Sequence, residues 1–465
     1  MWSVLKSINS DRSSVLSCMW IGTGLVLALV VMSQPARAAD ETPADGAAKP
    51  AVAEQTPVEQ MKEVWNRELL TGDWEGWRTA LQEHGIDPHF RLAQYGQWVA
   101  DGGQETAGAY GGTMDYRVNA DLRKLFGLWD GLQVSMHARS RWGHDVNEET
   151  GSFTLPNAGL MMPLPGSYTG TDVTGLTVTQ YLPFVADRLA YVTLGKLDVL
   201  DTVNGFFPTV LGYGQEGFWN VNGLVTALPW FGAVNGLGLY GGILGTVNQE
   251  FQMAESGILF TGTENVSDSW NSLQDSFDDG VWIAAFHRFL WKVDEKPGYF
   301  LLFGGGSTRD QPSNDPHDFL NPPGPGIVDT KEEKPWDIAM YLYQVFWQDG
   351  DDPTRKATIF IGGTVGPDNP QFAQYHVFAA LEAHGPMASR PRDRMGVSYW
   401  KNWLSDDFKD LLSVERLRDL WGVEIYYNIA INQWLHLTPD LQFVKNAKKG
   451  EDLAIVPGIR AVIDF

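Results

Sequence analysis

The chain has 465 residues and is acidic, with 57 Asp and Glu against 34 Lys and Arg and a formal net charge of −23. This balance disfavours nucleic acid as a partner, because phosphate binding requires a basic surface. The length alone would suit two or three domains, but a single large β-barrel is equally long. Aromatic residues make up 12% of the chain, which also holds 19 Trp and 50 Gly.

Residues 1–38 are predicted to be an export signal peptide. Lys6 and Arg12 form a basic start, an apolar stretch covers Val15–Met32, and Ala36-Arg37-Ala38 has the small-residue pattern of a cleavage site. The apolar stretch is also long enough for a transmembrane anchor, but the small residues beside it favour cleavage after Ala38. Cleavage would remove Cys18, the single cysteine, and leave no possible disulfide.

Residues 39–84 are predicted to be a flexible leader followed by short periplasmic helices. The first part is rich in Ala, Pro, Glu and Thr, a composition typical of disorder. Apolar residues then recur at helical spacing over 57–70, and a second helix is predicted over 74–84, with Trp77 and Leu81 on one face. We expect these helices to pack against the end of the following domain.

Residues 85–465 are predicted to form an all-β, antiparallel outer-membrane barrel. The uncharged stretch Val221–Val247 contains seven Gly and Pro229, residues that disfavour a helix, so it is interpreted as strands and turns. With no spanning helix after the signal, a closed barrel is the remaining route across a membrane.

Polar and apolar residues alternate with a period of two along several segments, as in strands that separate an apolar from a polar environment. The predicted polar faces are His89, Arg91, Tyr95 and Gln97; Asp115, Arg117, Asn119 and Asp121; Gln133, Ser135, His137, Arg139 and Arg141; Glu424, Tyr426, Asn428 and Asn432; and His436, Thr438, Asp440 and Gln442.

A soluble β-sandwich shows the same alternation, but three features favour the membrane barrel. Several runs reach about 9–11 residues, the length that a tilted strand needs to cross a bilayer. The chain ends in an alternating strand whose last residue, Phe465, resembles the signal read by the outer-membrane assembly machinery. Tryptophans occur at the ends of runs, as in membrane-interface girdles: Trp98, Trp142, Trp347, Trp400, Trp403, Trp421 and Trp434.

Longer polar segments are predicted to be extracellular loops: 267–280, 310–336 and 348–353. Their carboxylates could share divalent cations with lipopolysaccharide, although a solvated acidic loop is the favoured interpretation. The sequence contains no H-E-x-x-H, C-x-x-C, P-loop or G-x-S-x-G motif, so neither an enzyme nor a metal or cofactor site is predicted. An outer-membrane hydrolase would need a histidine beside a nucleophile, and no pattern ties His89, His137 or His436 to a serine.

Four motifs, in order, resemble the OprB-type carbohydrate-selective porins. They are the stretch Leu69–Arg78, which contains T-G-D-W-E-G-W-R; Leu194–Asp198, where the family more often has Arg at the position of Lys196; Arg390–Gly396; and Trp434–Gln442 within the last strands. The resemblance implies a barrel of about 16 strands that passes small sugars such as glucose by passive diffusion. Arg390, Asp393 and Arg394 are expected in a tight periplasmic turn, and 72–78 is expected to be a packing motif.

A neutral sugar requires hydrogen-bonding groups together with an aromatic surface, and the polar faces supply both. The residues predicted to line the pore are Arg91, Tyr95, Arg117, Asp121, His137, Arg139, Arg141, Glu424 and Tyr426, with the two tyrosines as stacking surfaces and Asp121 and Glu424 as hydrogen-bond partners. Cross-strand pairing that only holds the barrel round is the alternative role for each of these charges. A general or anion-preferring porin is the alternative function, and a homo-oligomer is possible.

Overall fold

The computed structural model describes residues 57–151, 153–163, 169–207, 215–223, 237–267, 273–319 and 331–465. The predicted signal peptide and the first part of the leader lie outside the described residues. The chain divides into two units, residues 1–63 and 64–465. Helix α2 (Pro57–Asn66), predicted from its apolar spacing, crosses this boundary in the sequence.

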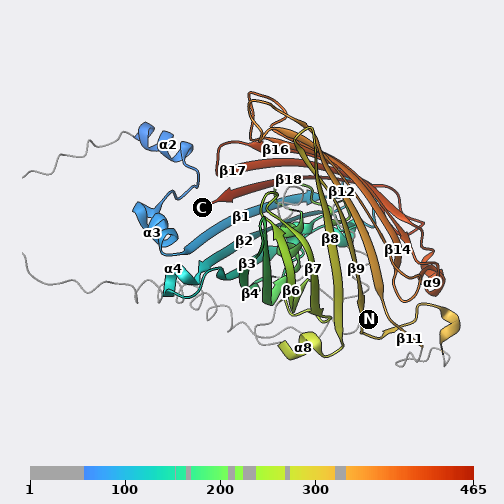
Figure 1. Cartoon of the computed structure of the whole chain (residues 1–465). Helices are drawn as coiled ribbons and strands as arrows, with labels where there is room; N and C mark the ends of the chain where they lie inside the picture. The colour runs from blue at the N-terminus through green and yellow to red at the C-terminus, as the bar shows by residue number, and fades with distance from the viewer. Residues whose placement is uncertain are drawn as a thin grey trace, which may run out of the picture. The chain divides into compact units, whose positions relative to one another are not determined.

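Sixteen antiparallel strands of the second unit form a closed barrel, which confirms the predicted fold. The barrel closes where β1 pairs with β18, from Arg91 opposite Asp464 to Gln97 opposite Gly458, and Figure 1 shows these two strands side by side. The strands are β1 (Ile86–Trp98), β2 (Gly108–Asp121), β3 (Leu132–Gly143), β4 (Gly170–Val185), β5 (Arg188–Asp198), β6 (Gly238–Asn248), β7 (Met253–Gly262), β8 (Val281–Val293), β9 (Lys296–Ser307), β12 (Trp336–Gln348), β13 (Lys356–Val365), β14 (Ala373–His384), β15 (Arg394–Leu404), β16 (Leu420–Ala430), β17 (Leu435–Lys445) and β18 (Ala454–Asp464).

The alternation of the sequence places polar side chains inside the barrel and apolar ones outside. On β16, Glu424 is fully buried in the interior, whereas the neighbouring Ile425 is 46% exposed on the outer surface. Such an apolar outer face is typical of a barrel that stands in lipid. Among the described residues, no helix is both long and apolar enough to span a bilayer.

The connections differ at the two ends of the barrel. Because neighbouring strands are antiparallel, the connections 122–131, 186–187, 249–252, 294–295, 349–355, 385–393 and 431–434 all lie at one end, here called the short-turn end. The connections at the other end, the long-loop end, include 144–169, 199–237 and 308–335. The prediction that 348–353 belongs with the long loops is therefore wrong. Its acidic composition resembled theirs, but the strand order decides the end.

Short helices and one small sheet occupy the connections. They are η1 (Trp74–Gly76), α3 (Trp77–Glu83), α4 (Leu122–Phe126), α5 (Asn147–Thr150), η2 (Ala158–Leu160), α6 (Val199–Phe206), η4 (Val221–Gly223), α8 (Leu273–Phe277), η5 (Pro316–Asp318), α9 (Asp406–Leu411) and η6 (Ser413–Glu415), with β10 (Gln311–Pro312) paired to β11 (Glu332–Glu333).

The predicted helix over 74–84 forms as η1 followed by α3, and it packs differently from the expectation. Trp77 is 61% exposed, whereas Arg78 is buried. Arg78 donates a hydrogen bond of 2.7 Å to the backbone oxygen of Phe465, and its guanidinium lies 4.2 Å from the Trp74 ring centroid. The motif thus joins the chain before the barrel to the end of the last strand, as a packing motif would.

One of the expected girdle tryptophans faces the interior. Trp400 of β15 is fully buried inside the barrel, whereas Trp98 and Trp347 are exposed on its outer side. The prediction for Trp400 was wrong because position 400 has the inward phase of its strand, like the buried Ser398 and Asn402.

Candidate functional site

The predicted pore-lining residues do point inward, but most are covered by chain inserted into the barrel. The insertion comes from the connections 144–169 and 199–237 at the long-loop end, and its described part includes residues 215–223, here called the inner segment. Hydrogen bonds between the barrel wall and the backbone of this segment demonstrate the insertion, since they involve the inward-facing side chains of Glu424 on β16 and Arg460 on β18.

Charged side chains of the barrel hold the inner segment. Glu216 forms ion pairs with Arg91 at 2.6 Å and with Arg394 at 3.0 Å, and Arg91 also pairs with Asp464 at 2.6 Å. Glu424 accepts a hydrogen bond from the backbone N–H of Asn220 at 2.9 Å and another from that of Trp219. Arg460 donates to the backbone oxygen of Gly217 at 2.8 Å. Arg91 and Glu424 therefore act here as anchors of the inserted chain.

The two tyrosines predicted as stacking surfaces are covered in the same way. Tyr95 is buried against Trp219, with ring centroids 5.7 Å apart. Tyr426 is buried against Phe218, with centroids 4.9 Å apart, and its hydroxyl donates to Glu382. Neither ring is open to a passing sugar, so the predicted stacking role is wrong for both in this structure.

His137 belongs to a charged cluster of six side chains, which are Asp115 and Arg117 of β2, His137 and Arg139 of β3, Asp198 of β5 and Asp201 of α6. The two ring nitrogens of His137 each lie 2.7 Å from a carboxylate oxygen, Nε2 from Asp115 and Nδ1 from Asp201. Arg139 is fully buried and donates to Asp115 at 2.6 Å. Arg117 lies 3.7 Å from Asp201. The predicted residues Arg117, His137 and Arg139 are thus brought together.

Helix α6 carries Asp201 into the lumen. Asp198 caps the helix, since its Oδ1 accepts from the backbone N–H groups of Leu200 at 2.9 Å and Asp201 at 3.2 Å. The sequence did not reveal Asp198 and Asp201 as site residues, although an Asp directly before an apolar run is a helix-start signal. At the other end of α6, Phe206 and Phe207 are buried on the opposite side of the lumen.

That opposite side is an aromatic wall, which consists of Phe286, Tyr299, Tyr341, Tyr343, Phe360 and Phe378 on strands β8, β9, β12, β13 and β14. The Phe207 ring centroid lies 4.8 Å from that of Tyr341 and 5.3 Å from that of Phe360. The Phe206 centroid lies 4.8 Å from that of Phe286. Helix α6 therefore reaches from the charged cluster to the aromatic wall.

The charged cluster and α6 border a cavity of about 450 Å³ inside the barrel. Its lining includes the amide of Asn119, the hydroxyls of Ser135, Thr177 and Thr193, and the ring of Tyr191. Asn119 is exposed to the cavity, whereas most predicted pore residues are buried. Groups that donate and accept hydrogen bonds beside an aromatic ring form the kind of site that can hold a sugar, and a cavity of this size is typical of small-molecule sites.

His137, Asp198 and Asp201 lie close enough together to hold a metal ion. However, the Arg117 guanidinium lies 3.7 Å from Asp201 and Arg139 binds Asp115 directly, so two fixed positive charges already balance the carboxylates. This arrangement favours a proton on His137 over a divalent cation.

The two remaining predicted pore residues have other contacts. Arg141 is buried and donates to Asp145 at 3.1 Å, at the long-loop end of β3. Asp121 ends β2 at the short-turn end, where it caps α4 by accepting from the backbone N–H of Arg123 at 3.0 Å. The prediction for Asp121 in the constriction was wrong, because the strand ends at this residue and its carboxylate is used by the cap.

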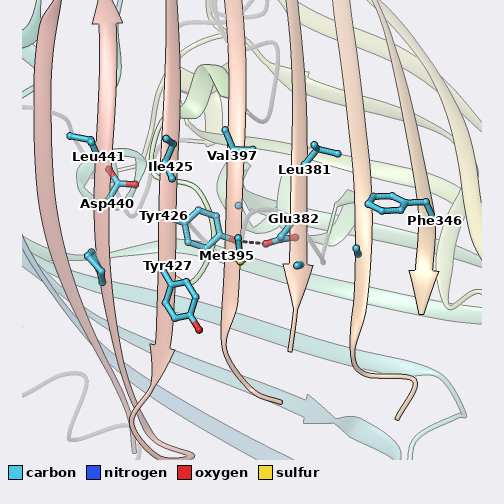
Figure 2. Close-up of a pocket in the computed structure, with 14 residues that line it drawn as sticks. Phe346, Leu381, Glu382, Met395, Val397, Ile425, Tyr426, Tyr427, Asp440 and Leu441 are labelled. Atoms are coloured by element: carbon cyan, nitrogen blue, oxygen red, sulfur yellow. Dashed lines mark hydrogen bonds between the residues drawn. The ribbon is translucent and has the colours of Figure 1, made fainter. Parts of the chain in front are cut away.

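A larger hollow of about 530 Å³ lies on the outer surface of the barrel, over strands β12 to β17. Figure 2 shows Leu381, Val397 and Ile425 on adjacent strands in this hollow, with the hydrogen bond between Tyr426 and Glu382 beyond them. The outward side chains that line it are almost all apolar. This hollow faces the lipid and offers little to a sugar, so the interior cavity is the candidate site.

Comparison with known proteins finds similarity to carbohydrate-selective porins. Residues 305–465 match the family described as carbohydrate-selective porin, OprB family. Porin B of Pseudomonas aeruginosa is 23% identical over 446 residues, which cover 85% of this chain and 91% of that protein. The resemblance to the OprB family is confirmed. The closed barrel and the match to this family model support a carbohydrate-selective porin, a channel of the outer membrane.

Solved structures show the same fold. The high-pH structure of Pseudomonas putida OprB aligns with a TM-score of 0.71 at 18% identity, and covers 86% of this chain and 99% of that one. The low-pH structure of the same protein aligns with a TM-score of 0.52 at 16% identity, over the same shares of the two chains.

The matched OprB region contains two of the four motifs found in the sequence, Arg390–Gly396 and Trp434–Gln442. Arg390 and Asp393 lie in a turn at the short-turn end, as predicted, where Asp393 accepts from the Tyr427 hydroxyl at 2.7 Å. Burial alone would raise the pKa of Asp393, but hydrogen bonds from Arg390 and Tyr427 hold this pKa below its ordinary value. Arg394 instead begins β15 and points inward to Glu216, so its assignment to the turn was wrong.

The motif Leu194–Asp198 lies outside the matched region and ends β5 beside the charged cluster. Lys196, where the family more often has Arg, is buried at the cavity and donates to the backbone oxygen of Ser267 at 3.5 Å. An ammonium group offers a point charge in place of the forked donors of Arg. The motif therefore places Lys196 and Asp198 at the candidate site.

Proposed function

We propose that the chain is a passive channel for small neutral sugars, such as glucose, and that sugars pass through the cavity beside α6. The observation that carries this proposal is the lining of the cavity, where the amide of Asn119, three hydroxyls and Tyr191 lie next to charges that pair with one another. Carboxylates and guanidiniums that neutralise each other give no strong preference for ions of one sign, whereas an ion-selective pore is lined by one sign.

The test is the rate at which proteoliposomes swell in isosmotic glucose, in glucuronate as a charged solute of similar size, and in a trisaccharide. We expect glucose to enter fastest. In Asn119→Leu, glucose entry should fall about two- to tenfold, because one hydrogen bond is worth about 0.5–1.5 kcal/mol. Gln94→Leu is the matched control, since this amide lies on the outer side of β1 and accepts from the Tyr110 hydroxyl. Equal entry of glucose and glucuronate would instead favour a general porin.

Export and assembly complete the proposal. We propose that residues 1–38 are removed as a signal peptide and that residues 39–84 then serve as a periplasmic leader with short helices. Phe465 is proposed to be read by the barrel assembly machinery, and its backbone contacts with Phe90 and Arg78 close the end of the barrel. Contacts with lipopolysaccharide at the long-loop end and a homo-oligomer also remain proposals. Mass spectrometry of the exported chain would test cleavage after Ala38.

A further inference from the structure

We propose that His137 is a proton-dependent latch that fastens helix α6 to the barrel wall. The contacts of its ring carry the proposal. Nε2 lies 2.7 Å from Oδ1 of Asp115, which belongs to β2, and Nδ1 lies 2.7 Å from Oδ2 of Asp201, which belongs to α6. The imidazole therefore joins β2 to α6 through two short contacts, beside the longer Arg117–Asp201 ion pair of 3.7 Å.

Both contacts require that the ring be an imidazolium. An ionised carboxylate only accepts hydrogen bonds, and a neutral imidazole has one N–H and one lone pair. A neutral ring could serve one carboxylate, but its second nitrogen would set a lone pair against the other carboxylate at 2.7 Å. The protonated ring therefore binds both Asp115 and Asp201, whereas the neutral ring can donate to only one of them.

The charged groups that surround His137 favour its protonated form. They are Asp115 and Arg117 from β2, Arg139 from its own strand, Asp198 from β5 at 3.5 Å, and Asp201 from α6. Lys196 of β5 borders the same cavity and donates to the backbone oxygen of Ser267. Within the six-residue cluster, three carboxylates face two guanidiniums, so a protonated His137 makes the cluster neutral.

Loss of the proton would release the Asp201 side chain in the first turn of α6 and not Asp115 of the wall. Asp115 is fully buried and keeps Arg139 at 2.6 Å and the side-chain amide of Gln215 at 2.7 Å, so it holds the remaining N–H of the ring. The Asp201 side chain is 30% exposed and can be hydrated in the cavity. Phe206 and Phe207 would still hold the other end of α6 on the aromatic wall. The first turn of α6, which follows β5 directly, borders the cavity, so a shift of the released Asp201 side chain widens the opening available to solutes.

The experiment measures single-channel conductance in potassium chloride, without sugar, as the pH is raised. We expect the wild-type conductance to increase through one transition that carries one proton. His137→Gln and Asp201→Asn should both lose the transition and show the high-pH conductance throughout. His436→Gln is the matched control, because this inward-facing histidine contacts the neutral Asn428 amide and the variant should keep the transition.

Heat-modifiable electrophoretic migration of each variant confirms that the barrel is folded before its conductance is compared. A transition that persists in folded His137→Gln would overturn the proposal and assign the pH dependence to another pair, such as the hydrogen-bonded carboxyls of Glu424 and Asp440. A zinc salt that reproduces the low-pH conductance at high pH would also overturn it, in favour of a metal. The latch deepens the proposed function, but the measurement contains no sugar, so its failure would leave sugar diffusion untouched.

Discussion

The charged side of the lumen and the aromatic wall hold inserted chain in different ways. On the charged side, Arg91, Glu424 and Arg460 bind the inner segment through ion pairs and backbone hydrogen bonds. On the aromatic wall, Phe206 and Phe207 pack mainly through contacts between rings, and Arg288 adds one hydrogen bond of 2.8 Å to the backbone oxygen of Phe206. Directional polar contacts fix the register of a backbone, whereas ring contacts tolerate small shifts.

This difference suggests how one barrel can have both a fixed constriction and a movable part. The inner segment is bound by side chains of β1, β15, β16 and β18, so it belongs to the rigid wall. Helix α6 has polar contacts at Asp201 in its first turn and at the Phe206 backbone oxygen, which accepts from Arg288, and its apolar seat is formed by Phe206 and Phe207. The predictions below test this division, from the largest expected effect to the smallest.

Arg91→Ala should have the largest effect on stability. The substitution would leave the buried Asp464 and the part-exposed Glu216 without the cation that both now contact, and removal of one member of a buried ion pair costs about 3–5 kcal/mol. The measurement is the free energy of unfolding in detergent, followed by tryptophan fluorescence. Arg123→Ala is the control, because the exposed ion pair of Arg123 with Asp130 should contribute less than about 1 kcal/mol. Equal losses in the two variants would refute the anchoring role.

Phe207→Ala should cost about 3 kcal/mol through the lost ring contacts on the aromatic wall. Unlike Arg91→Ala, it should also increase fluctuations of the single-channel current, since α6 would lose part of its apolar seat. Phe126→Ala is the control, because this ring is 66% exposed in the turn before β3. A quiet current in Phe207→Ala would show that the wall does not hold α6.

Glu424→Gln should cost about 1–3 kcal/mol. The carboxylate now accepts from the backbone N–H groups of Trp219 and Asn220, and an amide would direct its own N–H₂ group at one of them. We expect faster limited proteolysis within the inner segment, measured by mass spectrometry. Gln94→Leu, on the outer side of β1, should leave the cleavage rate unchanged. If both variants resist proteolysis like the wild type, Glu424 is not an anchor.

Tyr427→Phe should have the smallest effect, because Tyr427 lies outside both the charged side of the lumen and the aromatic wall. It removes one hydrogen bond to Asp393, which keeps Arg390 and the backbone N–H of Ala430, so the cost should be about 1 kcal/mol or less. Unfolding in detergent measures the loss, and conductance should not change. A changed conductance would mean that this turn affects the pore.

The sequence by itself determined the barrel and the direction of its side chains. Residues such as Arg139 and Glu424 could be assigned to the inside because a strand alternates strictly between two faces, and one face of this barrel meets lipid. The family motifs added the expected strand number, which the closed sheet of sixteen strands confirms.

The tertiary structure alone decided which inward residues remain open to a solute. Tyr95 and Tyr426 have the correct phase, yet the inner segment covers both, because contacts between residues far apart in the chain leave no periodic signal. The partners Asp201 and Glu216 come from connections that no alternation can place. The alternation of a strand shows which of its side chains face inward. The pore, however, is shaped by connections that fold into the barrel, and these leave no periodic pattern in the strands.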